Sequence, residues 1–208
     1  MTGNTNFRQM NVVNYEGTSA SGGSRGPTRG CTIPPVTPLT NDRTTIDGAI
    51  DVMNADGYTH IPLGIAWGWR VISPGEPFTQ GTAYDDPDWN KAVVILTDGE
   101  NTIDTESNWN YSNYSAYGHL RKGRFGTTDS STFVDNLNTK TTTLCNKLKD
   151  NNVRVYTLTF QVSTDTVRDL MRDCASDPSL YFDSPSGTEL RAAFKAIGVD
   201  LNNLRISK

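Results

Sequence analysis

The residues best suited to binding chemistry are Asp98 and Thr59. Asp98 is the first charged residue after the apolar run at residues 92–96, within the segment KAVVILTDGEN. This run predicts a central strand buried on both faces, and the carboxyl ends of such strands form the ligand crevice of an open α/β sheet. Thr59 precedes a predicted helix, where its hydroxyl suits a cap, an anion or a metal. Each residue alone also fits a structural role, Asp98 in a turn with Gly99 and Thr59 as a helix cap.

Residues that would carry catalysis are sparse. No glycine-rich phosphate loop follows a predicted strand, and neither histidine has a paired nucleophile. His119 lies beside basic residues and fits a solvated loop, a ligand or a proton carrier. The pair Asp85 and Asp86 lies in a turn-rich segment that favours a solvated loop. A non-enzymatic module is therefore the leading hypothesis, and an enzyme or a nucleotide- or flavin-binding domain on a Rossmann-like sheet is the alternative.

Composition limits the other classes. The 208 residues, 35% of them hydrophobic, are enough for one main domain. A net charge of −4 with scattered basic residues gives no electrostatic case for nucleic acid. No apolar run approaches the ~20 residues needed to span a bilayer, so a membrane is expected only through an anchor absent from this chain.

The elements that must position Thr59 and Asp98 alternate between helix and strand. A helix follows Asp42 and is expected to pack one face on the sheet, and a second spans residues 62–73. Strands are predicted at residues 92–96, 153–160 and 180–182, and the later helices are marked by the apolar positions Phe133 to Leu148, Val167 to Cys174 and Leu190 to Leu204. This order predicts a doubly wound, mainly parallel α/β sheet flanked by helices.

Two segments do not fit this alternation. Residues 1–30 begin with a short strand candidate at residues 10–13 and continue as a Gly/Ser-rich stretch that predicts flexibility. Residues 99–128 form a long polar connection with aromatic residues that favour protein interfaces. We expect a partner to bind here through Trp109, Tyr111, Tyr114 and Tyr117. The alternative is that these rings fold back and cover the sheet.

Cys145 and Cys174 are predicted to form a disulfide in an oxidising compartment. They lie near the ends of the helices before and after the strand at residues 153–160, and right-handed crossovers place such helices side by side. Facing positions on neighbouring helices come within the ~4.4–6.8 Å between Cα atoms that a disulfide requires. Two reduced core cysteines are the alternative, and Cys31 is left without a partner.

Several motifs carry a family resemblance. The threonine loop at Thr59, TDGEN after the central strand, and the strand VRVYTLTF resemble a von Willebrand factor type A domain. The segments PLTNDRTTID, GYTHIPLGIAWGWRVISPGEPF and CNKLKDNNVRVYTLTF resemble the C-terminal region of TadG-like proteins of tight-adherence (Flp) pilus systems. The resemblance covers nearly everything from Cys31 onward, so residues 31–208 are expected to form a partial or divergent type A-like domain. It implies a protein-interaction or adhesion module with a protein partner in the cell envelope, periplasmic and membrane-anchored in the full-length protein.

The same resemblance implies an incomplete metal-ion-dependent adhesion site. Thr59 matches the threonine ligand of this site and Asp98 the aspartate ligand, but the D-x-S-x-S loop and its strand are absent. The nearest segments, at Asp129 and Asp183, lack the serine spacing. We therefore expect Mg²⁺ or Mn²⁺ only if the missing motif is supplied. Two accounts stay open, a fragment of a larger protein and a divergent, metal-free domain.

Overall fold

A computed structural model describes residues 33–55, 57–105, 107 and 111–206. The strand candidate at residues 10–13, the predicted flexible segment 1–30, Cys31 and Trp109 lie outside these residues. The chain divides into two compact units, residues 1–57 and residues 58–208, which are described separately.

The described part of the first unit contains one helix, α2 (Arg43–Asp51). It begins where the sequence predicts, because the Asp42 carboxylate accepts hydrogen bonds from the N–H groups of Thr44 and Thr45. Within its own unit α2 buries none of its residues, and Ile50 is 56% exposed. That one face of this helix packs on the sheet stays a prediction. Helical spacing of apolar residues shows that a helix has an apolar face, but not which surface covers that face.

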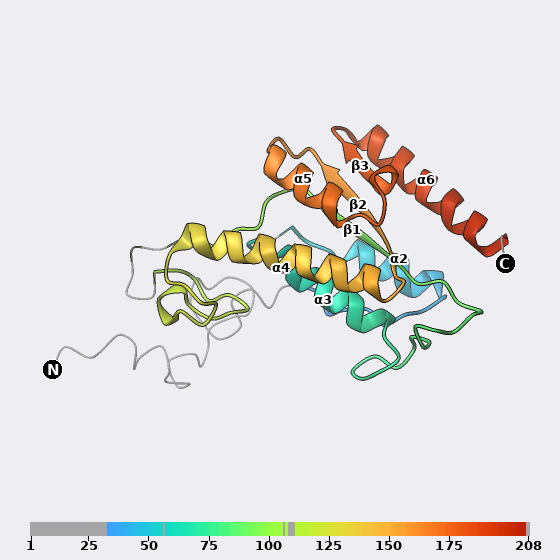
Figure 1. Cartoon of the computed structure of the whole chain (residues 1–208), viewed down its shortest axis with the longest axis horizontal. Helices are drawn as coiled ribbons and strands as arrows, with labels where there is room; N and C mark the ends of the chain where they lie inside the picture. Colours follow the sequence, from blue (N-terminus) through green and yellow to red (C-terminus); the bar gives the residue numbers. More distant parts are fainter. Residues whose placement is uncertain (1–32, 56, 106, 108–110, 207–208) are drawn as a thin grey trace. The chain divides into compact units, whose positions relative to one another are not determined.

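The second unit is built on a parallel sheet with the strand order β1-β2-β3 (Figure 1). The strands are β1 (Ala92–Thr97), β2 (Arg154–Phe160) and β3 (Tyr181–Ser184). Ala92 lies opposite Arg154, and Thr157 lies opposite Tyr181. The parallel α/β fold predicted from the alternation of elements is therefore confirmed.

Helices cover both faces of this sheet. On one face lie α3 (Ile61–Ile72), α4 (Ser130–Asp150) and α5 (Asp165–Cys174), whose apolar side chains share a core with Ile95 of β1 and Val155 of β2. On the other face α6 (Gly187–Ile206) places Ala193 and Ile197 against Tyr156 and Leu158 of β2. Two short 3₁₀ helices, η2 (Leu120–Lys122) and η3 (Pro178–Leu180), complete the described elements.

The prediction that β1 is a central strand buried on both faces is wrong, because β1 lies at the edge of the described sheet and one of its faces is exposed. Val94 and Leu96 alternate with the buried Ile95 and are 39% and 48% exposed. Among the described residues, no strand pairs with the edge of β1 that faces away from β2. The predicted buried stripe of α6 is also only partly correct, because Phe194 is 46% exposed while Ala193 and Ile197 are buried.

A disulfide joins α4 to α5. It links Cys145 to Cys174, with their Cα atoms 5.2 Å apart, and both residues are buried in the core. Beside it, the Lys149 ammonium donates a hydrogen bond to the carbonyl oxygen of Asp173, 2.9 Å away. The ends of α4 and α5 are thus fixed to each other by a covalent bond and a charged hydrogen bond.

Candidate functional site

Asp98 lies at the carboxyl end of β1. The preceding residue, Thr97, is buried, and its hydroxyl donates to the carbonyl oxygen of Gly99 and accepts from the N–H of the same glycine. Thr97 therefore closes the turn that the sequence assigned to Asp98. Among the residues that the structure describes, none forms a hydrogen bond or ion pair with the exposed Asp98 carboxylate. That side chain is available for a ligand at the crevice.

Thr59 is held at the same end of the sheet through its backbone. Its N–H donates to the Thr102 hydroxyl at 3.0 Å, and its carbonyl oxygen accepts from the Thr102 N–H at 2.9 Å. Because Thr102 follows β1 by only a few residues, this pairing brings the loops of Thr59 and Asp98 to one edge. The N-cap position of α3 is occupied by His60, whose own side chain forms no capping hydrogen bond.

Asn101 connects the parts of this edge, and sequence reasoning missed it. Its side chain is 2% exposed, and its Oδ1 accepts a 2.8 Å hydrogen bond from the N–H of Ile61 at the start of α3. Its Nδ2 donates to Asn138 Oδ1 at 2.9 Å and to Thr141 Oγ1 at 3.4 Å, both on α4. Asn101 thus supplies the missing cap of α3 and ties it to α4. No local pattern in the sequence marks Asn101, because its hydrogen-bond partners Ile61 and Asn138 are distant in the chain.

The metal prediction concerns Thr59, Asp98 and the two segments nearest to the missing motif, at Asp129 and Asp183. Within the described part of the chain, no three His, Cys, Asp or Glu side chains gather as a ligand group. Asp129 instead caps α4, accepting from the N–H of Thr132, and this hydrogen bond is the main cause that lowers its pKa. Asp183 accepts from the Thr159 hydroxyl at 2.9 Å and lies 3.5 Å from Arg168 Nε. Thr59 and Asp98 alone leave most of an octahedral Mg²⁺ shell to water.

The long connection after β1 is ordered in its second half by local hydrogen bonds. We call residues 111–125 the aromatic lobe. Ser112 is 1% exposed, and its hydroxyl accepts from the N–H of Leu120 at 2.9 Å. Ser115 and Gly118 exchange two backbone hydrogen bonds across a tight turn, and Gly118 has the positive φ, 85°, that favours glycine. The Asn136 side chain of α4 donates to the Phe125 carbonyl oxygen and fixes the end of the lobe.

Three tyrosines of this lobe have two different environments. Tyr117 stacks on Phe125, with ring centroids 4.0 Å apart, and meets Phe133 of α4 edge-on at 5.9 Å. Burial against these rings raises the pKa of Tyr117. Tyr111 and Tyr114 are 47% and 73% exposed. Tyr117 therefore lies in the underside of the lobe, while Tyr111 and Tyr114 lie on its surface.

His60 lies where this small core meets the start of α3. Its ring lies 5.9 Å from that of Tyr117 and 6.1 Å from that of Phe133. Burial lowers the pKa of His60, which favours the neutral ring at the positive end of a helix. The packing of His60 places the aromatic lobe directly beside the Thr59 loop.

Two surface hollows lie away from the edge that carries Thr59 and Asp98. One surface hollow runs along α6 between Ala192 and Asn203, and another is lined by residues that include Lys149 and Ser176. Neither hollow contains Thr59, Asp98 or a histidine. No helix within the described residues is long and apolar enough to cross a membrane.

Comparison with known proteins identifies the fold but no family. No protein-family model and no curated protein matches the chain. The crystal structure of the pilus adhesin SpaC from Lactobacillus rhamnosus GG is similar, with a TM-score of 0.50 and 18% identity over 76% of this chain. The match covers 20% of the SpaC chain, so our chain spans about a fifth of that protein. At this identity the similarity shows a shared fold alone.

Proximal thread matrix protein 1 from the mussel byssus is also similar. Its structure with a zinc-occupied MIDAS motif matches 93% of this chain and 40% of that chain, with 18% identity and a TM-score of 0.47. A second crystal form matches 77% of this chain and 32% of that chain, with 19% identity and a TM-score of 0.46.

Proposed function

We propose that this chain is a non-enzymatic protein-interaction module, a von Willebrand factor type A-like domain of a cell-envelope protein of the tight-adherence pilus type. The observation that carries the proposal is the ordered aromatic lobe, which presents Tyr111 and Tyr114 beside the crevice edge of the sheet. Tyrosines give a large contact area at a small entropic cost, so they suit a protein partner. The motifs from Thr59 to Asn101 that resemble the type A family lie at the same edge.

A location in the cell envelope agrees with the disulfide between α4 and α5. Disulfides persist in the periplasm and on cell surfaces, whereas cytosolic thiols are kept reduced. The resemblance to TadG-like proteins also supports a full-length protein that is anchored in the membrane.

The proposal includes at most weak binding of Mg²⁺ or Mn²⁺ by this chain. Thr59 and Asp98 supply two oxygen ligands, and we expect isothermal calorimetry with Mg²⁺ or Mn²⁺ to show no site of micromolar affinity. Asp98→Ala is expected to leave the calorimetric trace unchanged. A stoichiometric micromolar site that is lost in Asp98→Ala would instead establish a complete adhesion site built by this chain alone.

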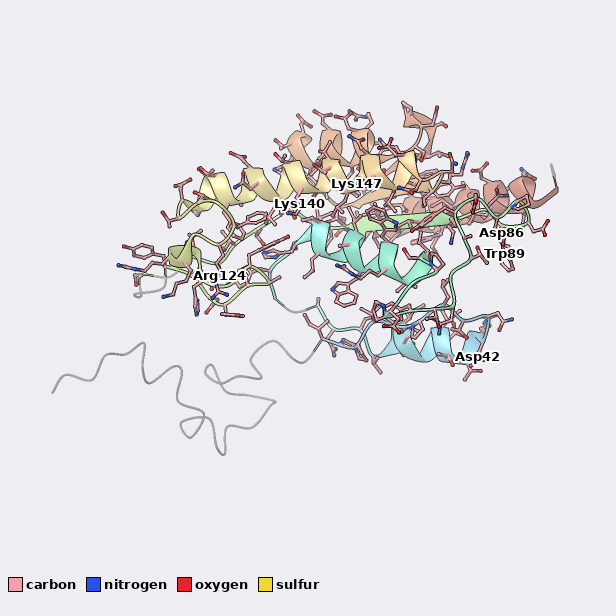
Figure 2. All side chains as sticks on the ribbon, turned by 60° about the horizontal axis from the view of Figure 1, so that its bottom comes forward. Asp42, Asp86, Trp89, Arg124, Lys140 and Lys147 are labelled. Carbon is pink, nitrogen blue, oxygen red and sulfur yellow. A yellow bond between two sulfur atoms is a disulfide. The ribbon has the colours of Figure 1, made fainter. Side chains whose placement is uncertain are left out.

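Site-directed photo-crosslinking tests the partner surface. Benzoylphenylalanine in place of Tyr114 is expected to give a discrete protein adduct in envelope preparations from cells with the pilus machinery, and none in cells lacking it. The same group at Trp89, which is 63% exposed and lies far from Arg124 in Figure 2, is the matched control. Equal adducts at both positions, or none at position 114, would contradict the proposal.

The alternative enzyme class has its own test. A nucleotide- or flavin-binding domain would show a ligand-dependent rise in melting temperature or a flavin absorbance band after purification. We expect neither.

A further inference from the structure

The aromatic lobe differs in charge from the rest of the chain. Residues 111–128 contain Arg121, Lys122 and Arg124 and no aspartate or glutamate, although the chain as a whole has a net charge of −4. Lys122 and Arg124 are exposed, and neither forms an ion pair with another residue that the structure describes. The aromatic lobe is therefore a locally positive region of a protein whose net charge is negative.

Cationic and aromatic side chains alternate over this lobe. The Arg121 guanidinium lies 4.9 Å from the centroid of the Tyr111 ring, and the Tyr114 ring meets His119 edge-on at 5.1 Å. Lys140 of α4 brings a fourth cation, with its Nζ 5.6 Å from the Phe125 ring (Figure 2). The cations of this surface can pair with the carboxylates of a ligand, and the ring faces can contact the part of the ligand between those carboxylates.

The shape of this surface is set before a partner binds. Tyr111 has φ 62°, a left-handed conformation that costs a residue with a side chain on the order of 1 kcal/mol. It is followed by the buried Ser112, whose carbonyl oxygen lies 3.1 Å from His119 Nδ1 and whose hydroxyl accepts from Leu120. Because these bonds already order the lobe, the free energy of binding does not have to offset the entropic cost of ordering it.

Building on the proposed function, we infer that the aromatic lobe binds an acidic, extended polypeptide segment. Carboxylates of the segment pair with Lys122 and Arg124, and its backbone lies across Tyr111 and Tyr114. Nucleic acid fits less well, because it requires a continuous basic track, whereas Lys122 and Arg124 form a short cluster.

Fluorescence anisotropy with a labelled peptide of alternating aspartate and glycine tests this inference. We expect saturable binding that weakens by about tenfold or more when the salt concentration rises several-fold above a low-salt buffer. Arg124→Glu is expected to abolish binding, and Lys122→Ala to weaken it by about three- to tenfold. The control is Lys147→Ala, since Lys147 is an exposed cation on α4 away from the lobe (Figure 2), and we expect it to change the affinity by less than about twofold.

Each outcome distinguishes the inference from its competitors. Loss of affinity in Arg124→Glu counts only if the melting temperature is unchanged, and Arg124→Gln separates charge reversal from loss of charge. Tighter binding of a heparin fragment or of single-stranded DNA than of the peptide would overturn the inference, as would an equal effect of Lys147→Ala. If the peptide fails to bind while the adduct at position 114 persists, the acidic-partner inference fails and the proposed function stands. If both fail, both are wrong.

Discussion

The removal of the Asn101 side chain is the sharpest test of how the crevice edge is held together. Asn101→Ala leaves the buried N–H of Ile61 without its acceptor and removes the donor to Asn138. The orientation of the amide is fixed, because a backbone N–H can only donate and must therefore face Oδ1. The amide oxygen of Asn101 therefore accepts from α3, and its amide nitrogen donates to α4.

The magnitude follows from these bonds. An unsatisfied buried N–H costs about 1–3 kcal/mol and a lost hydrogen bond about 1 kcal/mol, so Asn101→Ala should destabilise the fold by roughly 3 kcal/mol. Thr141 contributes little to this sum, since its hydroxyl still donates to the carbonyl oxygen of Leu137 at 2.9 Å. For a chain of this size the melting temperature should fall by roughly 6–12 °C.

A double-mutant cycle with Asn138→Ala isolates the link to α4. We expect Asn138→Ala alone to cost about 1 kcal/mol, and the coupling energy of the pair measured by urea unfolding to be about 1 kcal/mol. Asn146→Ala, an exposed asparagine on the same helix, is the control and should change stability by less than about 0.5 kcal/mol. A coupling energy near zero, or an Asn101→Ala variant as stable as the control, would refute the role given to this side chain.

Three further outcomes are expected. A Cβ atom at Gly81 would lie 2.3 Å from the carbonyl oxygen of Ile72, so Gly81→Ala should lower the free energy of unfolding, measured with urea, by about 1–3 kcal/mol, whereas Gly75→Ala, with open space around it, should not. The hydrogen bond from Tyr156 is the main cause that lowers the pKa of Asp200 below its ordinary 3.8, so its stabilisation is complete above that pH and is lost as the pH falls through the lowered value. Tyr156→Phe should therefore reduce the difference between urea midpoints measured at about pH 7 and about pH 3, and an unchanged difference would contradict this. Thiol titration of the denatured, oxidised protein should count one free thiol, and reduction should cost roughly 3–4 kcal/mol; three free thiols would rule out the bridge.

The sheet and its main helices could be predicted because their signals are local. The apolar runs at residues 92–96 and 153–160 and the spacing from Phe133 to Leu148 each reflect one element burying its own face. At the start of α6 the Ser186 hydroxyl contacts the Glu189 carboxylate, and this capping-box spacing is also a short-range pattern. Where a pattern depends on a distant partner, as at Phe194 of α6, the sequence does not show which surface covers the side chain.

The candidate edge was predicted in part for the same reason. Thr59 and Asp98 stand out because each follows or precedes a recognisable element, and their loops do meet at one end of the sheet. Asn101 did not stand out, because its partners Ile61 and Asn138 are about 40 residues away in either direction. Nothing in the order of residues marks which polar side chain will be buried between two helices.

Tyr114 and Tyr117 show why residue type alone could not assign the interaction surface. They are three residues apart and chemically identical, yet Tyr117 packs on Phe125 while Tyr114 is 73% exposed. The difference arises because the tight turn between Ser115 and Gly118 reverses the chain and directs one ring to the core under the lobe. The predicted partner surface is therefore compatible with Tyr111 and Tyr114, and the alternative of rings that fold back is compatible with Tyr117. A partner that needs aromatic contact must bind through Tyr111 and Tyr114, and substitution of Tyr117 would act on affinity only through the order of the lobe that presents them.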